Sequence, residues 1–218
     1  MEAKISQIRK DVLNASYEAG ACHIGSALSC VPVMVQLFYN GMKEGDIFLF
    51  SKASGVATYY AILADKGFFL KEKLVEYLKQ YPLPSTEVPG VFHAFGSLGH
   101  GLPVACGMAL ADRSRNVHVL LSDGECQEGS TLEAVLFARQ HNLVNLHVFI
   151  DNNELQALGR TEDILDLSTV FDFMEESLPN CTVVNTIKGC GVDFMENNND
   201  WHYQNLTKDL LDSALAQV

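Results

Sequence analysis

The chain has 218 residues, 48% of them hydrophobic and 19% charged, which is typical of a globular protein with a sizeable core. Its formal net charge of −12 argues against binding to nucleic acid or to an anionic membrane surface. The first residues, MEAKISQIRK, lack the apolar core of a signal peptide. The chain has no run of about 18 apolar residues, so no membrane span is predicted. Six cysteines without a C-x-x-C pair favour reduced thiols in a cytoplasmic protein. We therefore expect one domain over residues 1–218.

Two helices are predicted at the beginning of the chain. The first is indicated by apolar residues at helical spacing before Gly20, namely Ile5, Ile8, Val12 and Leu13. His23 and Gly25 precede the second helix, for which Ser29 is the expected cap and Gly41 lies past the end. A lone histidine in a loop between helices is more often structural than catalytic.

A short strand and a glycine-rich segment come next. Residues 47–50 (IFLF) predict a buried strand, followed by a turn and a helix through Ala64. Residues 71–80 suggest an exposed helix, and the prolines of residues 81–90 indicate a loop or lid. The segment GSLGHGLPVACGMALADR then places four glycines before or within a helix that includes residues 105–111. Glycines before a helix let backbone amides approach an anion, although a loop that packs helices together explains them equally well.

The central segment, residues 117–155, predicts a strand, a helix and a second strand. Residues 117–122 (VHVLLS) and 146–151 (LHVFID) are apolar and β-rich, as buried parallel strands require. Between them, Ser130 and Glu133 form a capping-box pattern, followed by an apolar face of Leu132, Val135 and Leu136. Asp123 and Asn153 follow the two strands, so both should lie at the edge where open α/β sheets bind ligands. Their oxygens suit Mg²⁺. Taken alone, SDG (residues 122–124) is most simply a turn and DNN (residues 151–153) a loop at the end of a strand.

The last part of the chain predicts one helix after residue 160 and a strand over residues 181–187 (CTVVNTI). The segment around His202 (WHY) is by itself most simply an aromatic packing cluster. An amphipathic helix from Leu206 ends the chain, with inward leucines at 210, 211 and 215.

These motifs together resemble a known family. Asp123-Gly124, 27 intervening residues and Asn152-Asn153 are similar to the GDG…NN motif of thiamine diphosphate enzymes, with Ser122 in place of the first glycine. The strings SDGECQEGSTLEA and DNNELQALGRTEDI resemble the amino-terminal, diphosphate-binding part of transketolases, in particular of split transketolases that carry this part as a separate subunit. The resemblance implies an α/β fold: an open, mostly parallel sheet with helices on both faces. A strand–helix unit that the family carries before residues 181–187 is missing here, so a narrower sheet is expected.

The resemblance also implies a set of site residues. The Mg²⁺ ligands would be Asp123, Asn153 and the backbone carbonyl of Leu155. Thiamine diphosphate would be contacted by the GSLGHG loop and the central motif, through Gly96, Ser97, Leu98, His100, Gly124 and Glu125. His100 occupies the position of a family glutamine.

Three further positions match family histidines. His23 (ACHIG for SGHPG) and His202 (NNNDWH for NNPEWH) would be the catalytic histidines, with His202 also contacting the diphosphate. Ser54 stands where the family's LSKGHA has its histidine, and a serine can still donate one hydrogen bond to a phosphate oxygen. Weaker cofactor binding or an altered donor pocket is the expected consequence.

The function implied is transfer of a two-carbon ketol unit from a ketose to an aldehyde or to a modified sugar acceptor, in carbohydrate metabolism. A glutamate essential to this chemistry lies on a pyrimidine-binding domain in the family, and nothing after Trp201 is long enough to supply it. We therefore expect a separate pyrimidine-binding subunit, in a heterotetramer, and no activity of this chain alone. Alternatives are another thiamine diphosphate enzyme, such as a deoxyxylulose phosphate synthase or a 2-oxoacid decarboxylase, and a non-catalytic scaffold that binds a partner.

Overall fold

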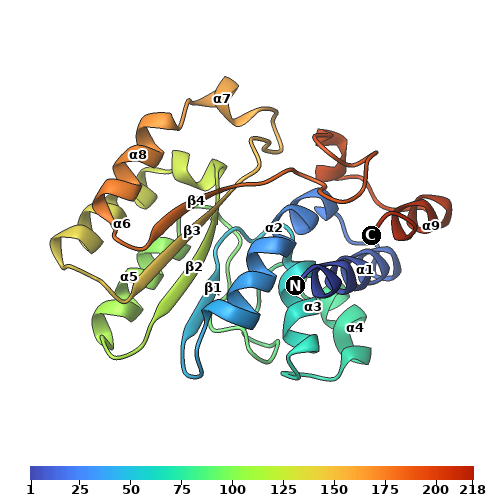
Figure 1. Ribbon diagram of the computed structural model, residues 1–218, viewed down its shortest axis with the longest axis horizontal. Coiled ribbons are helices and arrows are strands. Elements are labelled where there is room, and N and C mark those ends of the chain that lie inside the picture. The colour runs from blue at the N-terminus through green and yellow to red at the C-terminus, as the bar shows by residue number, and fades with distance from the viewer. The chain divides into compact units, whose positions relative to one another are not determined.

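The computed structural model describes residues 1–218, which form two compact units, each described by itself below (Figure 1). The helical unit consists of residues 1–42, 54–91 and 186–218, and the sheet unit of residues 43–53 and 92–185. No helix is long and apolar enough to cross a membrane.

The sheet unit is built on four parallel strands in the order β1-β2-β3-β4. They are β1 (Ile47–Phe50), β2 (Val117–Ser122), β3 (Leu146–Asn152) and β4 (Cys181–Asn185). The helices are α5 (Gly101–Ala111), α6 (Gly129–Gln140), α7 (Thr161–Ile164) and α8 (Ser168–Ser177), with a 3₁₀ turn η3 (Gly124–Gln127) after β2. The prediction of an α/β fold with a parallel sheet is confirmed.

Alternation along the strands determines the core of the sheet unit. Val117, Val119 and Leu121 of β2 point to the same face as Leu146, Val148 and Ile150 of β3, and all six are at most 2% exposed. Figure 1 shows α5, α6 and α8 along one side of the sheet. Because all four strands run in the same direction, the residues just after β2 and β3 lie at a common edge.

The helical unit packs around its first helix. α1 (Glu2–Ala19) ends at Gly20, which has a left-handed φ of 64° as the sequence predicts. α1 contacts α2 (Ile24–Gln36), α3 (Val56–Asp65), α4 (Leu74–Gln80) and α9 (Lys208–Leu215). The shorter elements of this unit are η1 (Leu37–Gly41), η2 (Lys71–Lys73) and η4 (Asn199–His202).

Two predicted helix caps are wrong. α2 begins at Ile24, directly after His23, and Ser29 is buried within the helix, where its hydroxyl donates to the Ser26 carbonyl at 3.1 Å. The capping box at Ser130 does not form, because the Ser130 hydroxyl donates to the Gly99 carbonyl at 2.7 Å. In both cases a tertiary or interior hydrogen bond satisfies the hydroxyl that local spacing assigns to a cap.

The buried face of α6 also differs from the prediction. Leu136 is 55% exposed, while Ala134, Val135 and Ala138 are buried. The small alanines allow α6 to lie close to α5, so the helix turns its leucine outward. In addition, residues 160–180 contain two helices, α7 and α8, instead of one.

A stacked pair of imidazoles, of which His118 is buried and His147 is half-buried, lies on the other face of the sheet. His118 of β2 stacks on its register partner His147 of β3, with ring centroids 4.6 Å apart, and His118 Nε2 lies 3.0 Å from Asp46 Oδ2. The Nδ1 atom of His118 is buried without a partner. Burial lowers the pKa of His118, an effect that Asp46 partly offsets, and burial together with His118 lowers the pKa of His147.

We expect this pair to make folding stability sensitive to acid. The unfolded chain binds protons at these imidazoles at a higher pH than the folded chain, so the free energy of unfolding should fall as the pH drops below the ordinary value of 6.5. His118→Gln keeps a donor for Asp46 but cannot titrate, so its loss of stability in acid should be smaller by up to about 1.4 kcal/mol per pH unit. Urea denaturation of both proteins between about pH 7.5 and about pH 5.5 measures the difference. If the free energy of unfolding changed equally with pH in the two proteins, the prediction would be contradicted.

Candidate functional site

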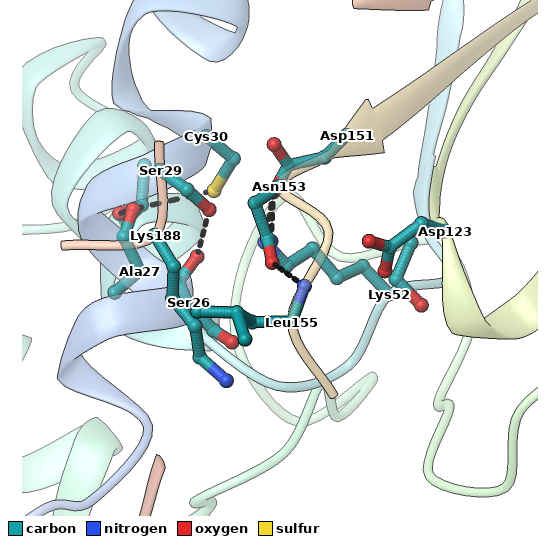
Figure 2. A network of polar contacts seen from close by, with 12 residues as sticks. Ser26, Ala27, Ser29, Cys30, Lys52, Asp123, Asp151, Asn153, Leu155 and Lys188 are labelled. Atoms are coloured by element: carbon teal, nitrogen blue, oxygen red, sulfur yellow. Dashed lines mark hydrogen bonds and ion pairs between the residues drawn. The ribbon is translucent and has the colours of Figure 1, made fainter. Parts of the chain in front are cut away.

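The carboxyl edge of the sheet brings Asp123 and Asn153 together, as predicted. Asp123 follows β2 and is 2% exposed, and Asn153 follows β3 and is 3% exposed. One Asp123 oxygen accepts the Gly124 N–H at 2.7 Å, and the other accepts the Thr161 hydroxyl at 3.1 Å. The Asn153 Oδ1 atom accepts the Leu155 N–H at 3.1 Å, so Leu155 lies at the same edge (Figure 2).

The chemistry of these donors suits a hard cation. Burial raises the pKa of Asp123, an effect that the Gly124 N–H and the Lys52 charge oppose. A desolvated carboxylate of this kind gains more from a bound cation than an exposed one does. No cluster of three His, Cys, Asp or Glu side chains able to hold a metal is present in residues 1–218. The candidate set is therefore one carboxylate, one amide oxygen and backbone carbonyls, which leaves coordination positions for phosphate oxygens and water, as Mg²⁺ requires.

The glycine-rich loop before α5 presents its first residues to solvent. Gly96, Ser97, Leu98 and His100 are exposed, while Gly99 is buried with a φ of 78°. A Cβ on Gly99 would lie 2.5 Å from Ser130 Oγ, and one on Gly101 would lie 2.0 Å from Ser51 Oγ. These two positions therefore require glycine for the loop to pass this close to its neighbours. Ring atom Nδ1 of His100 lies 3.1 Å from the Leu98 carbonyl, which holds the imidazole beside the loop.

Two further cofactor candidates, Glu125 and Gly124, lie behind this loop. Glu125 is fully buried, and its Oε1 atom accepts hydrogen bonds from the Ser51 hydroxyl and, at 3.0 Å, from the Gly99 N–H. Its Oε2 atom is buried without a partner, and burial raises the pKa of Glu125 to about 7. Gly124 is buried against Gln156, whose Cδ would lie 2.8 Å from an added Cβ. The geometry gives both residues a part in shaping the loop.

The helical unit brings the two predicted catalytic histidines together. His23, at the start of α2 with a φ of 63°, donates its backbone N–H to the His202 carbonyl at 3.0 Å. The two rings meet edge to face with centroids 4.8 Å apart, and Tyr203 lies against both. The two histidines are therefore distant in the sequence but form one cluster in the fold.

Lys188 determines how His202 presents its ring. The side chain is fully buried, and its Nζ atom lies 3.0 Å from Asn199 Oδ1 and 3.2 Å from His202 Nδ1. An ammonium group has no acceptor, so Nδ1 must accept from it and the ring proton lies on Nε2. His202 is therefore arranged to donate a hydrogen bond from Nε2.

An open cavity of about 420 Å³ adjoins His23 within the helical unit. It is lined mainly by small and apolar residues from the end of α1, the start of α3 and the proline-containing loop after α4, among them Cys22, Gly55, Ala57, Pro82 and Leu83. A cavity of this size admits a small sugar-like ligand next to an imidazole.

Ser54 directly precedes Gly55, a residue that lines this cavity, in the loop before α3. The preceding residue, Ala53, is 2% exposed and has a left-handed φ of 54°, a conformation that favours glycine. Ala53 stands at the glycine position of the family's LSKGHA string, and its backbone keeps the left-handed conformation that a glycine would take. Gly55 comes within contact distance of α2, since an added Cβ would lie 2.7 Å from the Ala27 nitrogen.

Three charged residues of these sites are not recognisable from sequence spacing alone. Lys52 and Asp151 form a buried ion pair in the sheet unit, and Lys188 orients His202 in the helical unit. Their signal in the sequence is a lysine or aspartate inside an otherwise apolar stretch, which a solvated position explains equally well.

Comparison with known proteins shows the family to which the chain belongs. The sequence profile of the family described as "Thiamine pyrophosphate enzyme, C-terminal TPP binding domain" matches residues 73–217. The chain is 34% identical over 265 aligned positions to the A-type subunit of apulose-4-phosphate transketolase from Actinobacillus succinogenes, covering 100% of this chain and 95% of the relative. It is 30% identical to 6-deoxy-6-sulfo-D-fructose transketolase subunit SqwG of Clostridium sp., covering 100% of this chain and 96% of that one. The first alignment is longer than 218 residues, so this relative carries additional residues.

Solved structures show the same fold. Transketolase from Leishmania mexicana superposes with a TM-score of 0.88 at 20% identity, over 98% of this chain and 40% of that one. Transketolases are transferases that use thiamine diphosphate with a divalent metal, and the subunit names of the relatives imply a partner. The chain therefore belongs to the thiamine pyrophosphate enzymes and, within them, to the A-type subunits of split transketolases.

Proposed function

We propose that Asp123, Asn153 and the Leu155 carbonyl hold Mg²⁺, and that the exposed loop from Gly96 to His100 holds the diphosphate of the cofactor. The observation that carries this proposal is the pairing of two buried oxygen donors at one sheet edge, at the ends of β2 and β3. With a net charge of −12 the chain needs a cation and backbone amides to bind a phosphorylated ligand. Ser54 adds at most one neutral hydrogen bond to the diphosphate.

When bound, thiamine diphosphate supplies a thiazolium carbon that accepts a two-carbon ketol unit and an electron sink for cleavage of the carbon–carbon bond. The proposed task of His202 is to donate a hydrogen bond from Nε2 to a substrate or diphosphate oxygen, because Lys188 occupies its Nδ1 side. His23 lines the 420 Å³ cavity, where it would hold the substrate hydroxyl and move a proton to or from it.

We propose a pyrimidine-binding partner subunit, in a heterotetramer, that provides the glutamate essential to this chemistry. A surface of the sheet unit supports the proposal. A cavity of about 510 Å³ between α5 and α6 is lined mainly by apolar groups and reaches Gly99 and His100 of the cofactor loop. Phe137 of its lining is 40% exposed, and Leu110 of α5 and Leu136 of α6 are 37% and 55% exposed, although all three side chains are large and apolar. A partner subunit bound here would cover these apolar side chains and would also cover the cofactor loop at Gly99 and His100.

The substrates of the relatives suggest the substrate class of this chain. Two relatives are named for sugar derivatives, apulose 4-phosphate and 6-deoxy-6-sulfo-D-fructose, each with an anionic group. We propose an anionic or otherwise modified sugar for this chain too, and a cytoplasmic location in keeping with its six free cysteines.

The test is turnover with and without the partner. The purified chain, a co-expressed pyrimidine-binding subunit and the complex of the two are assayed with a ketose phosphate donor and a short aldehyde, in the presence of Mg²⁺ and thiamine diphosphate. We expect turnover by the complex only. Turnover by the single chain at the rate of the complex would contradict partner dependence.

Ser54 favours a second candidate function, a scaffold without catalysis, because it stands at a family histidine position. Cofactor binding separates the two functions. If neither the chain nor its complex binds thiamine diphosphate in a Mg²⁺-dependent manner, the scaffold is supported and the proposed cation site is wrong. Binding and turnover with a 2-oxoacid instead of a ketose would identify a different thiamine diphosphate enzyme.

A further inference from the structure

A buried ion pair lies beside the proposed cation site without belonging to its ligands. Lys52 follows β1 and Asp151 lies in β3, and their side chains are 1% and 0% exposed. The backbone N–H of Lys52 donates to the Leu120 carbonyl at 3.0 Å, which holds this residue alongside β2. Figure 2 shows the Lys52 side chain extending toward Asp151. Burying two charges is costly, so such a pair at a ligand-binding edge calls for a functional explanation.

Asp151 also contacts a proposed ligand of the cation. The Asn153 Nδ2 atom donates to Asp151 Oδ2 at 3.4 Å, and the Asn153 Oδ1 atom accepts the Leu155 N–H at 3.1 Å. A carboxylate accepts hydrogen bonds and donates none, so only the NH₂ end of the amide can face Asp151. The oxygen end, which is the end a cation needs, is thereby turned away from Asp151.

Lys52 holds Asp151 in place for this contact. Its ammonium group pairs with Asp151 Oδ2, which is also the oxygen that accepts from Asn153 Nδ2. It also balances the charge of Asp151 within the ion pair. Asp123 then remains as the carboxylate whose charge a cation must balance.

We propose that Lys52 and Asp151 are positioning residues of the cation site: Asp151 fixes the Asn153 amide with its oxygen toward the cation, and Lys52 holds the Asp151 carboxylate in place through the buried ion pair. This inference rests on the proposed cation site. Neither residue needs to touch the metal or the cofactor. Partners of metal ligands commonly contribute about 10- to 100-fold to metal affinity.

Three variants test the role in the complex with the partner subunit. Asp151→Asn can donate as well as accept, so the Asn153 amide is free to turn, and Mg²⁺ affinity should fall by about 10- to 100-fold. Lys52→Met leaves a buried charge unpaired and should lower both thermal stability and Mg²⁺ affinity. The double variant Lys52→Met/Asp151→Asn removes that charge, so its stability should recover while its Mg²⁺ affinity stays low.

The measurements are the melting temperature of each ligand-free complex and calorimetric titration of Mg²⁺ in the presence of thiamine diphosphate. Asp46→Ala is the matched control, because it removes the acceptor of the His118 ring and of the Asn116 amide at the amino-terminal end of the strands. It should lower stability and leave Mg²⁺ affinity unchanged.

The outcomes separate the two proposals. If the unsubstituted complex shows no Mg²⁺-dependent cofactor binding, the cation site itself is wrong. If that complex binds and the double variant binds equally well, the pair is merely structural and the inference is overturned. Recovery of stability without recovery of affinity supports the positioning role.

Discussion

Replacing Asp123 with alanine is expected to abolish Mg²⁺-dependent binding of thiamine diphosphate, with an affinity loss of at least about 100-fold. Asp123 is the single carboxylate of the proposed ligand set, and its burial leaves no solvent to replace the lost charge. Calorimetric titration of the complex with cofactor, at several Mg²⁺ concentrations, measures the loss. Asp163→Ala, which alters an exposed side chain of α7, is the control and should bind like the unsubstituted complex.

Asp123→Asn should also lose Mg²⁺-dependent cofactor binding, but it should not destabilise the ligand-free chain. The neutral amide removes a desolvated charge, so the ligand-free chain should unfold with an equal or higher free energy, by about 1 kcal/mol. Chemical denaturation of the ligand-free chain measures this change. A variant that loses both stability and binding would indicate a structural role for Asp123 instead.

His202→Ala is expected to lower kcat/KM of the reconstituted complex by about 100- to 1000-fold. The reason is the loss of the Nε2 donor that Lys188 orients through Nδ1. Lys188→Met should lower kcat/KM less, since the imidazole remains but its tautomer is no longer fixed. Steady-state kinetics with saturating cofactor measures both effects.

A control for these variants is His147→Gln, which alters a histidine near the beginning of β3, far along the strand from Asn153. Its kcat/KM should equal that of the unsubstituted complex. If His202→Ala also retained full activity, the ring would be a packing group of the Trp201–Tyr203 cluster, and the assignment of His202 would be wrong.

The sequence by itself determined the framework of this site. The apolar runs of β2 and β3 and the helix between them predict a parallel pair, and parallel strands place the residues after them at one edge. This is why the pairing of Asp123 with Asn153 is predictable from the order of residues alone. The glycines at 99 and 101 indicate a loop that approaches either an anion or neighbouring elements, and the fold shows close packing against Ser130 and Ser51.

The tertiary structure alone decided which polar groups are buried and what they contact. The burial of Lys52, Asp151, Glu125 and Lys188 is not evident from the sequence, because it depends on strands and loops far away in the chain. Likewise the Ser130 hydroxyl bonds to the Gly99 carbonyl and not to its own helix, because a partner 31 residues away lies closer. Local periodicity fixes elements and their ends, whereas the partner of a buried polar group is fixed by distances in space.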